Sequence, residues 1–312
     1  MANVDLRQEV DVALDNGAAG FGMFRTEFLF MDNRPPTEEE QLEIYRGAVE
    51  AMAPRPVVIR TFDLGGDKLS GSIEPVAEPN PFLGWRGIRL CLDNPEFFKV
   101  QLRALLRAAA GADLRILIPM ITTLNELRRT KELIGEAARE LRGRRLDHSA
   151  DCRVGIMVEV PSTAITIDRF VPEVDFLSLG TNDLVQYTLA VDRTTPKVSD
   201  LYDHYDPAVL RLIRDVADSG RRHGVATSIC GEMAGDPLAA ILLLGLGVET
   251  LSVSPGLIPE LKEAVRSIAI ARAREIAAHC LTLESGADVR ICLEEEFSDS
   301  VLPRRRRPRF QV

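Results

Sequence analysis

Residues 154–160 read Val-Gly-Ile-Met-Val-Glu-Val, an apolar run that meets an acidic residue, Glu159, near its end. The core of this run, 156–158, does not alternate between apolar and polar residues, and neither does the run 116–118. Strands that are covered on both faces have this composition, because no side of them faces water. The two runs therefore predict parallel strands with helices packed over them.

The same strand-then-helix pattern continues from these runs toward both ends of the chain. Short apolar segments predict strands at 20–24, 56–61, 114–119, 154–160, 174–179, 225–230 and 250–253. Longer amphipathic segments predict helices at 37–51, 95–109, 124–142, 162–170, 207–223, 237–244 and 258–268. A closed barrel needs an eighth strand, and we assign it to residues 84–90, where there is room for it.

Strand–helix units repeated over about 250 residues are typical of a (β/α)8 barrel. We therefore predict an α/β fold, a (β/α)8 TIM barrel, over residues 1–284. An open doubly wound sheet is the alternative, and it is less favoured because no Gly-x-Gly-x-x-Gly turn follows the first predicted strand. From residue 285 the pattern fails, and we expect 285–312 to be a disordered tail, first acidic and then rich in arginine.

Composition excludes several classes of protein. A formal net charge of -9 argues against a general nucleic-acid binder, which is normally basic. No apolar run reaches the roughly 18–20 residues of a membrane span, and the N-terminus has no signal-peptide pattern, so we expect a cytoplasmic protein. The five cysteines form no Cys-x-x-Cys pair, so neither a disulfide framework nor a zinc site is predicted.

Polar residues fall where the predicted strands end. These positions are Arg25, Arg60, Glu159, the run 181–183 (Thr-Asn-Asp) and Cys230. In a (β/α)8 barrel the C-terminal ends of the strands form the active-site face. We therefore expect these side chains to converge on one mouth of the barrel.

The cationic members of this set suit phosphate and carboxylate oxygens. Arg25 and Arg60 are joined in the sequence by Arg86, Arg193 and Lys68. Arginine pairs with such oxygens through two parallel hydrogen bonds. The segment 65–68 (Gly-Gly-Asp-Lys) is a weak signal by itself, but a loop that closes over a phosphate is consistent with it.

Glu159 and Asp183 supply two hard oxygen ligands, the number that Mg²⁺ typically takes from a protein. Glu159 has the alternative of pairing with an arginine, and Asp183 and Asn182 have the alternative of capping the helix that follows them. Cys230 precedes Gly231 at a strand end, where it is either a small core hydrophobe or an acid or nucleophile.

Seven motifs, in this order, resemble the phosphoenolpyruvate-binding C-terminal domain of Enzyme I of the sugar phosphotransferase system. They occupy residues 21–31, 58–68, 80–86, 155–161, 179–187, 191–193 and 230–236. The resemblance covers about residues 4–270. Pyruvate phosphate dikinase and phosphoenolpyruvate synthase have similar barrels, but segments 180–187 and 191–193 are closer to Enzyme I.

The resemblance implies a role for each candidate. It implies phosphoryl-binding arginines with one supporting arginine, namely Arg25, Arg60 and Arg193 with Arg86. It implies substrate contacts by Asn182 and Asp183 and Mg²⁺ ligation by Glu159 and Asp183. Cys230 resembles the acid that protonates C3 of the pyruvate enolate.

The resemblance also implies partners. Full-length Enzyme I carries a phosphohistidine domain with a Gly-Gly-x-Thr-Ser-His type motif, which does not occur in these 312 residues. We therefore expect phosphoryl transfer to a histidine supplied in trans, together with a phosphocarrier protein, and a homodimer. Two alternatives are a non-catalytic phosphoenolpyruvate-binding or dimerisation module paired with a full-length Enzyme I, and a lyase or aldolase of the wider barrel group.

Overall fold

The strands of the protein form one closed parallel sheet. The computed structural model describes residues 1–5, 9–31, 34–65 and 78–297. Its eight strands follow one another around the sheet in chain order. They are β1 Ala2–Val4, β2 Phe21–Phe24, β3 Val57–Arg60, β4 Leu114–Ile118, β5 Arg153–Val158, β6 Phe176–Leu179, β7 Ala226–Ile229 and β8 Thr250–Leu251. A parallel bridge from Ala2 to Val253, just after β8, returns the sheet to its first strand.

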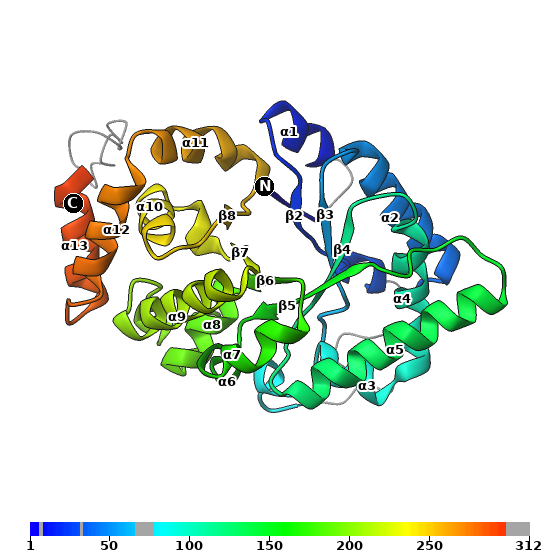
Figure 1. Ribbon diagram of the computed structural model, residues 1–312. Coiled ribbons are helices and arrows are strands. Elements are labelled where there is room, and N and C mark those ends of the chain that lie inside the picture. The colour runs from blue at the N-terminus through cyan, green and yellow to red at the C-terminus, as the bar shows by residue number, and fades with distance from the viewer. Residues whose placement is uncertain (6–8, 32–33, 66–77, 298–312) are drawn as a thin grey trace.

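Helices surround these strands, as Figure 1 shows. They are α1 Glu9–Asp15, α2 Glu38–Met52, α3 Ile88–Asp93, α4 Pro95–Ala108, α5 Leu124–Gly143, α6 Pro161–Ile165, α7 Ile167–Phe170, α8 Thr181–Leu189, α9 Pro207–His223, α10 Pro237–Gly245, α11 Ile258–Arg266, α12 Ile270–Cys280 and α13 Gly286–Phe297. The predicted (β/α)8 barrel is therefore confirmed, and the open sheet is not observed.

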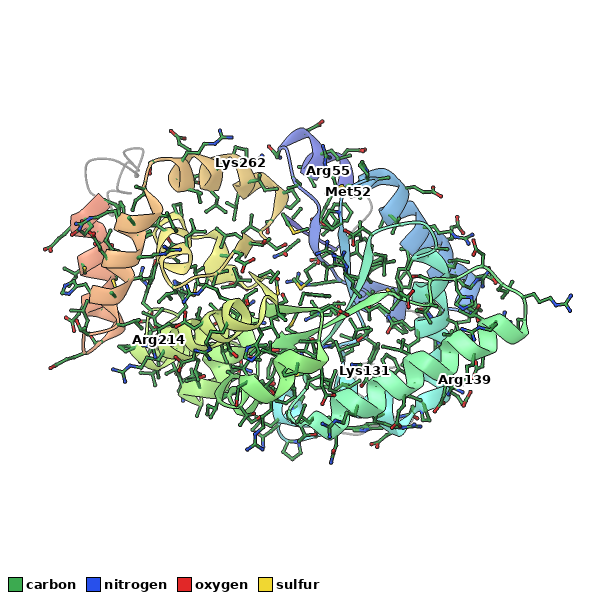
Figure 2. The ribbon with its side chains drawn as sticks, in the orientation of Figure 1. Met52, Arg55, Lys131, Arg139, Arg214 and Lys262 are labelled. Carbon is green, nitrogen blue, oxygen red and sulfur yellow. The ribbon has the colours of Figure 1, made fainter. Side chains whose placement is uncertain are left out.

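Apolar side chains fill the barrel on both sides of its wall. A small buried cluster comprises Met23, Val58, Leu117, Met157, Phe176 and Cys230. The first five come from the successive strands β2 to β6, and Cys230 directly follows β7; a much larger cluster lies between the strands and the helices. Charged side chains such as Lys131 and Arg139 on α5 are exposed (Figure 2).

The assignment of the eighth strand was wrong. Residues 84–90 form no strand, and α3 begins at Ile88. The missing strand is β1, only three residues long. Its backbone is held on both sides, because Ala2 N–H donates to the Gly20 carbonyl (2.9 Å) and Asn3 N–H donates to the Val253 carbonyl (2.7 Å). A run this short shows no sequence periodicity, so its neighbours rather than its own pattern make it a strand.

Part of the predicted tail, residues 286–297, also differs from the expectation of disorder. Residues 286–297 form α13, and residues 298–312 lie outside the described part of the chain. Val289, Leu293 and Phe297 are buried along one face of α13, at the four-residue spacing of a helix. The acidic run 294–296 concealed this apolar stripe in the sequence. Among the described helices, none is both long enough and apolar enough to cross a lipid bilayer.

Candidate active site

A cavity of about 420 Å³ lies at the C-terminal ends of the strands. Its lining includes all eight residues that the sequence proposed for the site: Arg25, Arg60, Arg86, Glu159, Asn182, Asp183, Arg193 and Cys230. The barrel thus brings together side chains as far apart in the chain as Arg25 and Cys230. Lys68 and the rest of segment 66–68 lie outside the described residues.

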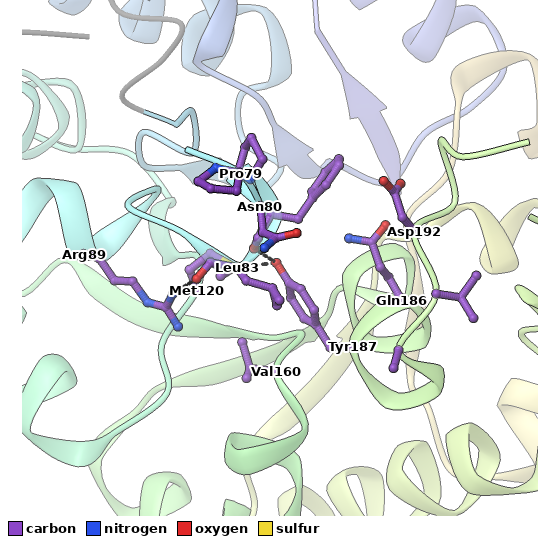
Figure 3. A pocket seen from close by; sticks show the side chains of 13 residues that line it. Pro79, Asn80, Leu83, Arg89, Met120, Val160, Gln186, Tyr187 and Asp192 are labelled. Atoms are coloured by element: carbon purple, nitrogen blue, oxygen red, sulfur yellow. Dashed lines mark hydrogen bonds between the residues drawn. The ribbon is translucent and has the colours of Figure 1, made fainter. Parts of the chain in front are cut away.

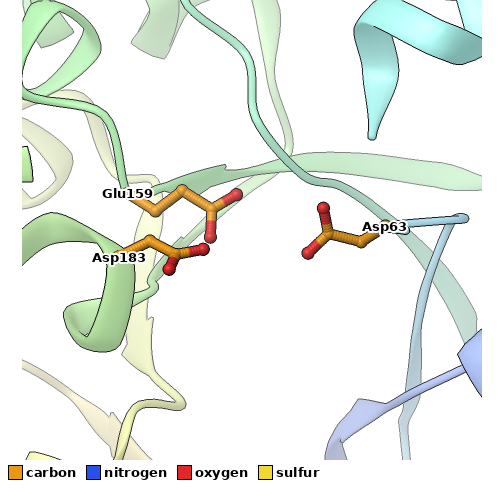
Figure 4. A group of neighbouring side chains, drawn as sticks. All are labelled: Asp63, Glu159 and Asp183. Carbon is orange, nitrogen blue, oxygen red and sulfur yellow. The ribbon is translucent and has the colours of Figure 1, made fainter. Parts of the chain in front are cut away.

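Three buried carboxylates form the floor of this cavity. Asp63, Glu159 and Asp183 each offer an oxygen, and these oxygens lie within 4.8 Å of one another. Figure 4 shows Asp63 facing the other two carboxylates from the opposite side. Burial, together with the negative charges of Asp63 and Asp183, raises the pKa of Glu159 well above its ordinary value. A divalent cation would relieve this repulsion, and clustered carboxylate oxygens are the ligands that hard cations prefer.

Sequence reasoning did not propose Asp63 for this group. Its signal was its position, three residues beyond the end of β3, on the same mouth of the barrel as Glu159. The run of residues after Arg60 reads as a loop, and a loop carboxylate is more often solvated. Only the packing of two arginines against it makes Asp63 part of the site.

Glu159 is held by the backbone and by close packing. Its Oε1 accepts a hydrogen bond from Met120 N–H at 2.6 Å. Met120 has a φ of 59°, a left-handed conformation that is uncommon outside glycine and is enriched at functional sites. A Cβ atom at Gly180 would approach the Cβ of Glu159 to 2.9 Å, so glycine leaves the space that this side chain occupies. Within the described residues no ion pair joins Glu159 to an arginine, so the alternative role as an ion-pair partner is not observed.

Arg60 and Arg86 lie deep in the cavity and share one carboxylate. Arg60 pairs with Glu27 (Nη2 to Oε1, 2.9 Å) and with Asp63 (Nη1 to Oδ2, 2.8 Å). Arg86 pairs with Asp63 through Oδ1 at 3.0 Å and with Asp183 through Oδ2 at 3.4 Å. Burial by itself lowers the pKa of Arg60. The negative charges of Glu27 and Asp63 raise it by more, so the net pKa lies above its ordinary value and the guanidinium stays charged.

Arg86 reaches the cavity from a loop and not from a strand end. It lies between the short 3₁₀ helix η3, Pro81–Leu83, and α3. The next residue, Gly87, has a φ of 56°, and a Cβ there would lie 3.0 Å from Asp63 Oδ1. The turn therefore depends on glycine both for its backbone angle and for the close approach to Asp63.

Arg25 and Arg193 lie at the rim. The Arg25 side chain is 37% exposed and pairs with Asp5 at 2.8 Å. The Arg193 side chain is 32% exposed and pairs with Glu232 at 3.2 Å. Glu232 is the first residue of the 3₁₀ helix η6, Glu232–Gly235, and is itself mostly exposed.

Asn182 joins this rim to helix α8. Its Nδ2 donates to Glu232 Oε1 at 3.0 Å, and its Oδ1 accepts from Glu232 N–H at 2.9 Å. Helix α8 begins at Thr181, so Asn182 and Asp183 lie inside its first turn, and no side chain caps it. The capping alternative is therefore wrong for both residues. Their side chains are committed to the cavity.

Cys230 belongs to the barrel interior and also lines the cavity. Its Sγ accepts a hydrogen bond from Ser178 Oγ at 3.4 Å and lies 3.6 Å from the Leu179 carbonyl, to which the thiol donates. Burial raises the pKa of the Cys230 thiol, although the Ser178 hydrogen bond and the charge of Arg60 oppose the shift. At neutral pH this group is a protonated thiol, which is the form that can donate a proton.

A second cavity of about 430 Å³ lies beside the first, and Phe82 lines both. Its walls are mostly apolar and include Leu83, Met120, Val160 and Tyr187 (Figure 3). The Tyr187 hydroxyl donates a hydrogen bond to the Phe82 carbonyl and so joins the two walls. The two cavities therefore share a side chain and a loop.

Known proteins resemble this chain in sequence and in fold. A phosphoenolpyruvate-protein phosphotransferase of Staphylococcus carnosus (strain TM300) is 46% identical over 301 residues, which are 95% of this chain and 52% of that protein. The phosphoenolpyruvate-protein phosphotransferase of Staphylococcus aureus is 45% identical over 287 residues, 91% of this chain and 50% of that protein. The chain thus spans about half the length of these curated relatives.

Among solved structures, a citrate lyase from Burkholderia xenovorans LB400 superposes with a TM-score of 0.52 and 16% identity. The match covers 97% of this chain and 92% of that one, and at this identity it shows the fold alone. The sequence profile of one family, described as "PEP-utilising enzyme, PEP-binding domain", matches residues 1–270. With that match over most of its length, the chain belongs to the phosphoenolpyruvate-binding domain family of phosphoenolpyruvate-utilising enzymes.

Proposed function

We propose that this barrel is a phosphoenolpyruvate–protein phosphotransferase domain that works with Mg²⁺. It transfers the phosphoryl group of phosphoenolpyruvate to a histidine on a protein supplied in trans and releases pyruvate. The observation that carries the proposal is one cavity in which arginines, clustered carboxylates and a protonated thiol face one another. Phosphoryl transfer is catalysed mainly by positioning and by positive charge, which this lining provides.

The arginines would bind the anionic substrate. Arg60 and Arg86 are fixed by carboxylates on one side, and both remain charged. Arg25 and Arg193 stand at the rim with part of each guanidinium open to solvent. Together they would hold the phosphoryl oxygens, with Arg86 in support, while the group passes to the histidine.

The donor set on the cavity floor fits a divalent cation. Glu159 and Asp183 would hold Mg²⁺, because their oxygens lie close together and the pKa of Glu159 stays raised despite the nearby charges of Arg60 and Arg86. When bound, Mg²⁺ supplies positive charge to oxygens of the substrate. Asn182 and Asp183, in the first turn of α8, would orient the substrate against it.

Cys230 would complete the reaction on the carbon side. Departure of the phosphoryl group leaves the enolate of pyruvate, whose C3 needs a proton. The Cys230 S–H bond breaks, the proton moves to C3, and pyruvate forms with a thiolate left on Sγ. The Ser178 hydroxyl and the positive charge of Arg60 favour that thiolate.

Partners and location follow from the same proposal. We expect a histidine-bearing phosphotransfer domain and a phosphocarrier protein as partners, in the cytoplasm. We also expect a homodimer. Three large apolar side chains are exposed, namely Leu83, Ile165 and Leu201, and Leu83 also lines the second cavity. Sedimentation equilibrium would show a dimer that weakens when Leu201 is replaced by Glu.

A non-catalytic phosphoenolpyruvate-binding or dimerisation module is the second candidate. Its cavity would bind phosphoenolpyruvate and would release no pyruvate.

The test is pyruvate release from phosphoenolpyruvate and Mg²⁺, with an Enzyme I histidine domain and its phosphocarrier added. We expect release that depends on every component, that is lost in Glu159→Ala, and that falls by about 100-fold or more in Cys230→Ala. Calorimetry should show that Cys230→Ala still binds phosphoenolpyruvate. Binding without any release by the wild-type chain would contradict the transferase and leave the binding module.

A further inference from the structure

We infer that Gln101 is a positioning residue, whose buried amide holds the two loops that carry Arg25, Glu27, Arg60 and Asp63 in one fixed register. This inference rests on the proposed function and deepens it. Gln101 lies on α4, outside the barrel wall, and is 2% exposed. It is not among the residues that line the cavity. Its effect on the site must pass through the loops it binds.

Every hydrogen-bonding direction of this amide is determined. Its Oε1 accepts from Phe62 N–H at 2.9 Å. Its Nε2 donates to Thr26 Oγ1 at 3.2 Å and to the Tyr45 hydroxyl at 3.1 Å. Because a backbone N–H can only donate, the carbonyl oxygen of the amide must face Phe62 and the nitrogen must face the hydroxyls.

The two hydroxyls are fixed in turn. Thr26 Oγ1 donates to the Arg60 carbonyl at 3.0 Å. The Tyr45 hydroxyl donates to Gln41 Oε1 at 3.0 Å. Thr26, Tyr45 and Gln41 are each at most 1% exposed, so water does not compete for these bonds. A buried polar network with every partner in place specifies one arrangement, because any alternative leaves a donor or acceptor unpaired.

The amide bridge, defined as Thr26, Gln101 and the backbone of Arg60 and Phe62, lies behind the site. Arg25 and Glu27, on either side of Thr26, line the cavity, while the Thr26 hydroxyl turns to Gln101 and to the next loop. On the cavity side, Arg60 pairs with Glu27 from the neighbouring loop. The two loops are thus joined twice, by charges in front and by neutral hydrogen bonds behind.

Substrate binding affects the Arg60–Glu27 ion pair and the amide bridge differently. A phosphoryl group that enters the cavity competes with Glu27 for the Arg60 guanidinium, so the front join weakens when substrate arrives. The amide bridge contacts no substrate and keeps its geometry. It would therefore keep the arginines in place during transfer, when a displacement of about 1 Å can cost about 100-fold in rate.

The test compares Thr26→Val with Thr26→Ser. Valine has nearly the shape of threonine and no hydroxyl, so it removes the bond to the Arg60 carbonyl and leaves one Gln101 donor unpaired. Serine keeps both bonds. Tyr45→Phe is the matched control, because it removes the other hydroxyl partner of Gln101, which lies on α2 and belongs to neither loop.

We expect Thr26→Val to lower kcat for pyruvate release by about 10- to 100-fold, with a smaller change in KM, while Thr26→Ser and Tyr45→Phe stay within about threefold. Thermal melts verify that each variant is folded at the assay temperature. Equal kcat in folded Thr26→Val and wild type would overturn the inference. So would an equal loss in Tyr45→Phe, since this would indicate a general packing defect.

A second readout does not depend on turnover. If the wild-type chain releases no pyruvate, the proposed function fails, and the bridge is then tested by hydrogen exchange of the Phe62 amide and by calorimetry with phosphoenolpyruvate. Thr26→Val should speed exchange of that amide and weaken binding by about tenfold, and Thr26→Ser should do neither. Exchange and affinity unchanged in Thr26→Val would overturn the positioning role.

Discussion

The floor and the rim of the cavity use the same residue types in opposite ways. On the floor, Arg60 is 13% exposed and its partner Asp63 only 1%. At the rim, Arg193 is 32% exposed and its partner Glu232 83%. The ion pairs on the floor are therefore shielded from water, and those at the rim are open to solvent. Removing one partner of a buried ion pair costs much stability, because the other charge is left buried and unpaired. An exposed ion pair contributes little to stability.

The largest expected effect is a loss of stability when a buried arginine of the floor is replaced. Arg60→Met should lower the free energy of unfolding by about 3 kcal/mol, because it leaves the Glu27 carboxylate and one side of Asp63 unpaired in a buried place. Arg193→Met, the matched change at the rim, should lower it by less than about 1 kcal/mol. Urea unfolding of both variants measures the difference. Similar losses in the two variants would mean that floor and rim do not differ as described.

A somewhat smaller effect tests what the floor is built to hold. Mg²⁺ at about 100 times its Kd should stabilise the wild-type chain by about 2.7 kcal/mol, since a ligand that binds only the folded state stabilises it by RT ln(1 + [L]/Kd). Asp183→Asn should remove most of that gain, because it takes away one of the clustered oxygens. Glu232→Gln, on the rim, should retain it. Urea unfolding with Mg²⁺ or with a chelator measures this stabilisation. If Mg²⁺ stabilised Asp183→Asn as much as the wild type, the cation would bind elsewhere.

The smallest effect sharpens the description of the rim. Glu232→Gln should change the free energy of unfolding by no more than about 0.5 kcal/mol, because the Glu232 side chain is mostly exposed. It should also tighten phosphoenolpyruvate binding by about twofold, since Arg193 no longer shares its charge with a carboxylate. Calorimetry measures the second effect. Weaker binding would show that Glu232 orients Asn182 more than it occupies Arg193.

Four of the eight proposed site residues were accessible from sequence because they end a strand or follow one directly: Arg25, Arg60, Glu159 and Cys230. An apolar run that ends in a charged residue, as at Arg60 and Glu159, is visible without any tertiary information. In a barrel every such end faces the same mouth, so the list of strand ends is already a list of neighbours. Cys230 could be placed in the same way.

Other parts of the site had no such signal. Arg86 arrives on a loop beside Gly87, where the resemblance and not the strand pattern indicated it. Asp63 gains its role from Arg60 and Arg86, which pair with it from two directions. Gln101 reads as one polar residue on an amphipathic helix, and only the packing of α4 shows that it is buried.

The sequence by itself therefore determined the parallel barrel, its strand ends and the residue types at them. Strands buried on both faces have continuous apolar runs, and the helices between them have amphipathic periodicity, so both can be recognised locally. The tertiary structure decided which groups touch. It made a strand of Ala2–Val4 by supplying a partner on each side, and it made a helix of Gly286–Phe297 by burying one face. It also enclosed Asp63 between two arginines. Each of these depends on residues far away in the chain, and no local pattern can report a contact that only the closed barrel creates.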